Sequence, residues 1–128
     1  MTYTTLQQAM ELSKLGLRES DMHYEQDINS PVDSWIVCIG KPNPQEIPCW
    51  SAEALLEMLP ITLYNDEGFE THNLELSKDN EDSYTICYSP IHPSDYDVIG
   101  DDEEFSESGD LLDVLIKACN WLLTYNYL

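Results

Sequence analysis

Basic residues are the scarcest feature of this sequence. Its 128 residues include only five lysines and arginines against 25 acidic residues, so the formal net charge is −20. Direct binding to nucleic acid needs clustered Lys and Arg that displace counterions, and anionic membranes need the same. The composition therefore argues against both, and it favours a basic protein surface or a bound cation as the partner. The five basic residues are scattered along the chain: Lys14, Arg18, Lys41, Lys78 and Lys117.

Long apolar runs and targeting signals are also lacking. No apolar segment approaches the roughly 20 residues that a membrane helix needs. The opening residues, MTYTTLQQAMELSKLG, contain no basic region followed by an apolar one, so no signal peptide is predicted and the expected location is the cytoplasm. The four cysteines form no CxxC pair and are predicted to be thiols instead of disulfides. Three of them lie in apolar segments and are expected in the core: Cys38, Cys87 and Cys119.

The sequence contains none of the motifs on which catalysis or cofactor binding usually depends. It has no glycine-rich phosphate loop, no GxSxG and no local cysteine-protease signature, so we predict neither an enzyme nor a cofactor. Its cysteines and histidines form no closely spaced ligand pair of the kind that zinc sites show. Asp95, Asp97 and Gly100 match three positions of a calcium loop, but the apolar Ile99 occupies a ligand position and Ser106 stands where a bidentate glutamate is needed. No metal site is predicted.

The apolar residues, 42% of the chain, recur periodically and predict a folded α+β protein, with residues 1–128 as a single globular domain. Residues 5–15 are typical of an amphipathic helix that ends at Gly16. Residues 34–40, SWIVCIG, are apolar on both faces, which indicates a central strand. The preceding segment, residues 20–27, is expected to be an edge strand.

The rest of the chain continues the alternation of helices and strands. Ser51 is a plausible N-cap of a helix that Pro60 ends. Residues 61–64, 71–77 and 83–89 are predicted strands, and the last two form a hairpin with Leu74 and Leu76 opposite Tyr84, Ile86 and Tyr88. A long loop is expected over residues 90–107, followed by a final amphipathic helix. The simplest packing is a mostly antiparallel sheet of four to five strands against about three helices.

Acidic residues gather between Asp95 and Asp110, where GDDEEFSESGD holds six carboxylates without a compensating cation. Such a run is often a solvated loop, and its last acids can favour the start of the final helix through the helix dipole. Many further acids lie between residues 66 and 82, which a single helix end does not explain. We predict a surface that binds a protein partner, formed by Asp95, Asp97, Asp101, Asp102, Glu103, Glu104, Glu107 and Asp110.

Aromatic residues are the second hint of an interface. The three tryptophans lie in or next to regular elements, so core packing is expected for Trp35, Trp50 and Trp121. Tyr125 and Tyr127 follow the last apolar positions of the final helix and are expected to be partly exposed. A tyrosine next to acids suits a protein interface, because it offers apolar contact together with a hydroxyl.

Three segments of the sequence carry a resemblance: TYTTLQQAMELSKLGL, IPCWSAEALLEMLP and LLDVLIKACNWLLTYNYL. Together they resemble small acidic proteins encoded by bacterial prophages and mobile elements, which implies an accessory or anti-defence role and transfers no residue role. In its charge the chain is also similar to phage proteins that mimic DNA, such as anti-restriction proteins and anti-CRISPR inhibitors.

Two functions follow from these observations. The first is a non-enzymatic binding protein that docks on a basic, nucleic-acid-binding partner, for example a nuclease, and inhibits it by phosphate mimicry. The second is an assembly component of a phage or mobile element, in which charge only confers solubility and the apolar helices form the oligomer interface. The sequence leaves the oligomeric state open.

Overall fold

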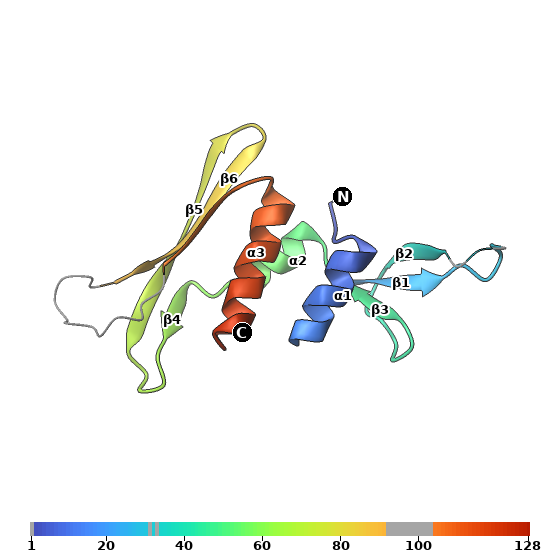
Figure 1. Cartoon of the computed structure of the whole chain (residues 1–128), viewed down its shortest axis with the longest axis horizontal. Helices are drawn as coiled ribbons and strands as arrows, with labels where there is room; N and C mark the ends of the chain where they lie inside the picture. The colour runs from blue at the N-terminus through green and yellow to red at the C-terminus, as the bar shows by residue number, and fades with distance from the viewer. Residues whose placement is uncertain (1, 31, 33, 92–103) are drawn as a thin grey trace. The chain divides into compact units, whose positions relative to one another are not determined.

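The computed structural model describes residues 2–30, 32, 34–91 and 104–128. The α+β class is confirmed, with three helices and two antiparallel sheets in these residues. The strands divide into sheets of three and four strands instead of forming one sheet. The chain separates into two compact units, Met1–Met58 and Leu59–Leu128, and each is described by itself below (Figure 1).

The N-terminal unit combines two helices with the three-stranded sheet. Its elements are α1 (Leu6–Leu15), β1 (Met22–Gln26), β2 (Trp35–Ile39), β3 (Ile47–Cys49) and α2 (Ala52–Met58). The predicted first helix is confirmed. Thr5 and Gln8 form a capping box at its start, and Gly16 ends it with φ 106°, a left-handed conformation that glycine adopts at little cost. Ser51 begins α2 as predicted, since its Oγ accepts the Ala54 N–H at 3.1 Å.

The strand order of this sheet contradicts the prediction. β1 lies in the centre and β2 at the edge, in the order β2-β1-β3. Trp35 and Ile36 are therefore exposed instead of lying in the core, and Ile39 is 79% exposed. The short strand β3 was missed because its Pro48 suggested a loop. Proline is tolerated there because β3 pairs on one side only, with β1.

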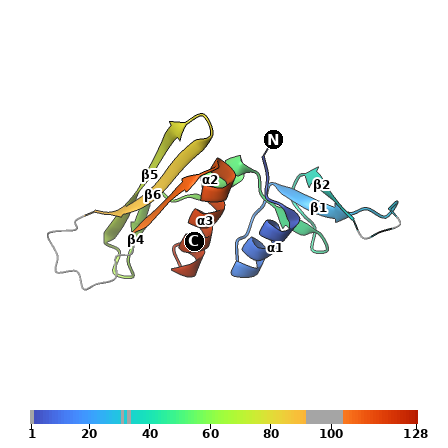
Figure 2. The ribbon, with the colours of Figure 1, turned by 45° about the horizontal axis from the view of Figure 1, so that its top comes forward.

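The C-terminal unit packs one helix on the four-stranded sheet. Its elements are β4 (Thr62–Tyr64), β5 (Glu70–Asn80), β6 (Ser83–Pro90), β7 (Phe105–Gly109) and α3 (Leu111–Thr124), and the strand order is β4-β5-β6-β7. The hairpin is confirmed, with Leu74 opposite Tyr88 and Leu76 opposite Ile86. Figures 1 and 2 show α3 next to this sheet. The buried side chains of α3 are Leu112, Val114, Leu115, Ala118, Cys119 and Leu122.

The predicted loop over residues 90–107 is wrong at its C-terminal end, because β7 begins at Phe105 and pairs with β6. Phe105 and Glu107 alternate with Ser106 and Ser108, which is the two-residue period of a strand. Phe105 is buried, whereas the two serines are exposed on the opposite face. The alternation is short and its polar residues gave no strong signal.

An aromatic cluster fills the space between α3 and the sheet within the C-terminal unit. Trp121 lies at its centre, and its ring centroid is 5.7 Å from that of Tyr88, 5.5 Å from that of Phe105 and 5.9 Å from that of His72. Tyr125 and Tyr127 contact the same ring from the end of the chain, at 5.5 Å and 5.6 Å. Trp121 therefore joins three strands, β5, β6 and β7, to the helix and the C-terminal residues of this unit.

The cysteines divide into two classes. All four are free, but only Cys49 and Cys119 are fully buried, whereas Cys38 and Cys87 are half-buried. Burial raises the pKa of Cys119 to about 12 and also raises the pKa of Cys49. The core position expected for Cys38 and Cys87 is thus wrong, because both lie on the sheet faces that are open to solvent.

No helix within the described ranges is both long and apolar enough to cross a membrane.

Candidate functional site

Five of the eight predicted partner-binding residues lie outside the described residues: Asp95, Asp97, Asp101, Asp102 and Glu103. The other three stand close together in sequence around β7. Glu104 precedes the strand and is exposed, Glu107 lies within it, and Asp110 follows it as the N-cap of α3. Edge strand β7 and the start of α3 therefore position the described end of the acidic run.

Glu107 and Asp110 each have a local role in the fold. Glu107 lies opposite Ile86 on the face that α3 covers, and its Oε2 is 3.6 Å from Nζ of Lys117. The Asp110 side chain accepts the Asp113 N–H at 3.5 Å, and the negative charges of both residues favour the N-terminus of α3. The helix dipole thus explains why Asp110 and Asp113 are acidic, but it does not explain the acidic side chain of Glu104, which lies before β7.

A hollow of about 520 Å³ runs between β7 and α3 in this unit. Glu104 and the Glu107–Lys117 ion pair line it together with Trp121 and Tyr125, and Tyr125 is 44% exposed. The fold thus brings carboxylates of the acidic run next to exposed aromatic surface. Such a combination can hold a lysine or arginine side chain of a partner. The Glu104 carboxylate pairs with the positive charge, and the ring of Tyr125 packs against the alkyl chain or the guanidinium plane.

The remaining acids of the C-terminal unit stand mainly at the ends of its hairpins. Sixteen of the 25 acidic residues and two of the five basic ones belong to this unit, so its formal charge is −14. Asn65 and Asn80 fix the two turns by accepting backbone N–H groups, including that of Asp82 at 2.9 Å. The exposed acids at or next to these turns are Asp66, Glu67, Glu70, Asp79, Glu81 and Asp82.

The open face of the four-stranded sheet carries hydroxyls together with two carboxylates, since Glu75 lies opposite Cys87 and Thr85 donates a hydrogen bond to Asp79. Oγ1 of Thr85 lies 2.7 Å from Oγ of Ser108, and Sγ of Cys87 lies 3.2 Å from Oγ of Ser106. These pairs join β6 to β7 across the face that α3 leaves open. Most of the described acids therefore lie at the turns and at the β7 edge, and Glu75 adds an exposed carboxylate on the open face, opposite Cys87.

A second cluster of ionisable groups lies on the three-stranded sheet of the N-terminal unit. His23 is buried in β1, and its register partner in β2 is Cys38. Glu25 follows two residues later and so points to the same side of β1. Nε2 of His23 is 3.0 Å from Oε1 of Glu25 and 3.3 Å from Oε2 of Glu46, the residue that precedes β3.

Backbone groups hold two side chains of this cluster in place. Nδ1 of His23 lies 2.7 Å from the carbonyl oxygen of Gly40. The other oxygen of Glu46, Oε1, accepts the Asn43 N–H at 2.8 Å. The imidazole of His23 and the carboxylate of Glu46 therefore each have a hydrogen bond to the backbone, made by the atom that is not in the His23–Glu46 contact.

The environment of the cluster shifts three pKa values. The hydrogen bonds to the Gly40 carbonyl and to Glu25 raise the pKa of His23 above its ordinary value of 6.5. The hydrogen bond with His23 lowers the pKa of Glu25, and that with Glu46 lowers it further. Burial and the nearby Glu25 carboxylate raise the pKa of Cys38. The cluster thus favours a positive charge at Nε2 and negative charges around it.

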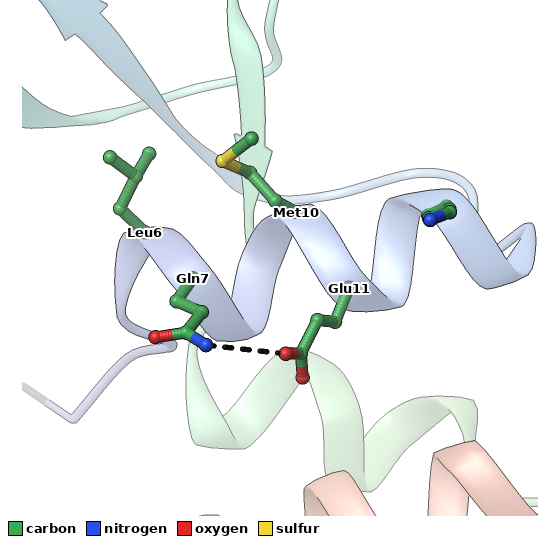
Figure 3. A pocket seen from close by; sticks show the side chains of 5 residues that line it. Leu6, Gln7, Met10 and Glu11 are labelled. Carbon is green, nitrogen blue, oxygen red and sulfur yellow. Dashed lines mark hydrogen bonds between the residues drawn. The ribbon is translucent and has the colours of Figure 1, made fainter.

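A further hollow, of about 480 Å³, follows the exposed side of α1 (Figure 3). Leu6 and Met10 provide apolar surface, and Gln7 donates a hydrogen bond to Oε1 of Glu11 at 3.5 Å. Lys14 completes the lining. The five described residues around it include no histidine, cysteine or serine, so this hollow offers contact area instead of a nucleophile.

Comparison of the chain with models of protein families, with curated proteins and with solved structures gave no match. Sequence reasoning missed Glu25 and Glu46. Only the pairing of β3 with β1 brings Glu46 next to His23, whereas Glu25 lies on the same strand as His23. The usable signal was His-x-Glu in a strand, since residues two apart share a face.

Proposed function

We propose that the chain is a non-enzymatic binding protein that docks on a basic protein surface through its C-terminal unit. The observation that carries the proposal is the hollow between β7 and α3, where the exposed Glu104 lies with Trp121 and Tyr125, next to the Glu107–Lys117 ion pair. A lysine or arginine of the partner enters this hollow, while the surrounding acids attract the partner's basic surface over a longer range.

Among the described residues of the C-terminal unit, few acids are neutralised internally, so their charge is available to a partner. Lys117 is paired with Glu107, and the other lysine of the unit, Lys78, has its Nζ 5.6 Å from the centroid of the Tyr84 ring. The hairpin-turn acids remain exposed. A field of this strength at an ionic strength of 0.15 M extends about 8 Å from the surface, so it acts mainly on the encounter rate and is weakened by salt.

A nucleic-acid-binding protein is the partner class that this chemistry fits best, because its binding site already accepts dense negative charge. Duplex DNA carries about one charge per 1.7 Å of its axis. The acids of the C-terminal unit stand in for phosphates in the proposed complex and block the partner, for example a nuclease. The resemblance to prophage and mobile-element proteins agrees with an anti-defence role of this kind.

Neutralising the acidic run is the direct test. In one variant Asp101, Asp102, Glu103 and Glu104 become Asn or Gln, and we expect it to lose binding to the partner captured from host lysate. The control changes four exposed acids of the N-terminal unit to Gln, so that both variants carry a formal charge of −16: Glu11, Glu19, Glu53 and Glu57.

The readout is the salt concentration at which the partner elutes, together with displacement by added duplex DNA. The run variant should release the partner at much lower salt than the control variant. Equal elution of the two variants would show that only total charge matters. Binding by the run variant as tight as that of the unmodified chain would contradict the docking surface altogether.

One observation favours assembly as a second candidate function. Edge strand β2 is exposed and contains no charged residue in a chain of charge −20. Its unpaired backbone groups and its apolar side chains Trp35, Ile36 and Ile39 suit antiparallel pairing with β2 of a second copy. The candidate interface is thus a strand edge, and not the apolar helices considered from the sequence.

Light scattering separates the two candidates. Assembly through β2 predicts a dimer that persists at high salt, because backbone pairing and apolar contact are not screened. Ile39→Lys should convert it to a monomer, whereas Ile61→Lys, at a site 77% exposed in the other unit, should leave it unchanged. A monomer at all protein concentrations would contradict assembly and agree with docking.

A further inference from the structure

Side chains of three chemical kinds converge on the open face of the three-stranded sheet. A ring nitrogen of His23, a carboxylate oxygen of Glu25 and Sγ of Cys38 all lie within 4.8 Å of one another. Glu46 adds a second carboxylate, with Oε2 at 3.3 Å from Nε2 of His23. In a tetrahedral zinc site, bonds of about 2.0–2.3 Å place the ligand atoms roughly 3.3–3.8 Å apart, so small side-chain rotations suffice to bring the ligand atoms of His23, Glu25 and Cys38 onto one ion.

The histidine ring is already oriented for a cation at Nε2. The Gly40 carbonyl can only accept a hydrogen bond, so Nδ1 of His23 carries the hydrogen in their 2.7 Å contact. Nε2 is then the nitrogen that faces the two carboxylates. An unprotonated Nε2 would point its lone pair at the negative oxygens of Glu25 and Glu46, which repel it. A proton or a metal ion bound at Nε2 removes this repulsion. Donation of the opposite N–H to a backbone carbonyl is the usual outer shell of a metal-bound histidine.

The mixture of donors selects the metal. Calcium and magnesium take oxygen ligands, which leaves the thiol of Cys38 without a role. Zinc accepts imidazole nitrogen, thiolate sulfur and carboxylate oxygen together, in a four-coordinate site. The fold also supplies the ligands from three separate segments, since β1 carries His23 and Glu25, β2 carries Cys38, and the loop before β3 carries Glu46.

We propose that His23, Glu25, Cys38 and Glu46 bind a zinc ion that clamps the three strands of the N-terminal unit together. Binding releases the Cys38 thiol proton to solvent, together with any proton held on Nε2 of His23, because the ligand atoms must be free of protons. The site lies in a different unit from the docking surface, so it is independent of the proposed function.

Cobalt reports the geometry and the sulfur ligand directly. Adding Co²⁺ to the full chain under reducing conditions should give the strong visible absorption of a tetrahedral site and a thiolate-to-cobalt charge-transfer band. Zn²⁺ should remove both by displacement. Cys38→Ser should abolish the charge-transfer band, whereas Cys87→Ser, which changes the other half-buried cysteine, should retain it. Absence of the band, or its persistence in Cys38→Ser, would overturn the proposal.

Protection of the thiol gives a test that needs no variant. Zn²⁺ should slow alkylation of Cys38 at least tenfold, measured by mass spectrometry, and leave the rate at Cys87 unchanged. Equal protection by Mg²⁺ at the same concentration would mean only general attraction of cations to an acidic chain, and would contradict a built zinc site.

The carboxylate ligands are tested by a matched pair of substitutions. Glu46→Gln should weaken zinc binding at least tenfold in calorimetry, whereas Glu57→Gln, an exposed site on α2, should leave it unchanged. Circular dichroism verifies that both variants fold. Equal zinc affinity of the two would remove Glu46 from the site. The acidic-run variant should keep full zinc binding, so failure of the docking proposal and failure of this one are distinguishable.

Discussion

Replacing Tyr88 with alanine should destabilise the C-terminal unit by about 3–5 kcal/mol, the range found for buried aromatic residues cut to alanine. Tyr88 is fully buried at the middle of the four-stranded sheet, between Leu74 of β5 and Phe105 of β7. Its ring stacks on Trp121 with an interplanar angle of 18°. Removing it leaves a cavity at the point where the strands meet α3.

The hydroxyl of Tyr88 makes a smaller, separable contribution. It donates a hydrogen bond of 2.7 Å to the Pro60 carbonyl, and burial raises its pKa. Tyr88→Phe keeps the ring and should cost about 1 kcal/mol, the net value of a typical hydrogen bond. The control is Tyr64→Ala in β4 at a site 54% exposed, which should cost within about 1 kcal/mol.

Native-state hydrogen exchange of the β5 and β6 amides measures these effects within the unit concerned. The expected order of destabilisation is Tyr88→Ala, then Tyr88→Phe, then Tyr64→Ala. A Tyr88→Ala variant no less stable than Tyr64→Ala would mean that the aromatic cluster around Trp121 does not hold this unit together.

Replacing Leu12 with alanine should destabilise the N-terminal unit by about 2–5 kcal/mol. Leu12 is 1% exposed on the buried side of α1, and its carbonyl accepts the Leu17 N–H at 3.0 Å in the motif that ends the helix at Gly16. Leu17 is also buried. The substitution removes core volume while leaving the helix propensity high, because alanine is the best helix former.

The matched control lies three residues further along the same helix. Leu15 is 45% exposed, so Leu15→Ala makes the same chemical change and should cost less than about 1 kcal/mol. Hydrogen exchange of the β1 amides reports on this unit. Equal losses for the two variants would contradict the burial of α1 that the structure gives.

The helices and the long hairpin were determined locally, and so were predicted well. Thr5 and Gly16 fix the ends of α1 by hydrogen bonds within a few residues of themselves. The period-two patterns around Leu74 and Ile86 specify both strands and their register, because a slip of one residue would move every apolar side chain to the other face.

The position of each strand in its sheet was not encoded locally. The apolar residues on both faces of β2 indicated a central strand, and yet β1, which carries Glu25 and Gln26, takes that place. A strand becomes central when partners on both sides reach it, and here the second partner is β3, about 25 residues further along the chain. Two strands so far apart in sequence pair only when the rest of the unit folds and brings them together, so the composition of one strand does not determine its place in the sheet.

The sequence by itself determined the charge of this protein, its α+β class and the ends of its helices, because composition and short-range hydrogen bonds act within a few residues. Only the tertiary structure decided which groups meet. Strand pairing placed Cys38 opposite His23 and added Glu46, and the packing of α3 on β7 placed Glu104 next to Tyr125. The residues in these contacts are up to about 23 positions apart in the sequence. At such separations, only strand register and helix packing fix the distance between two side chains.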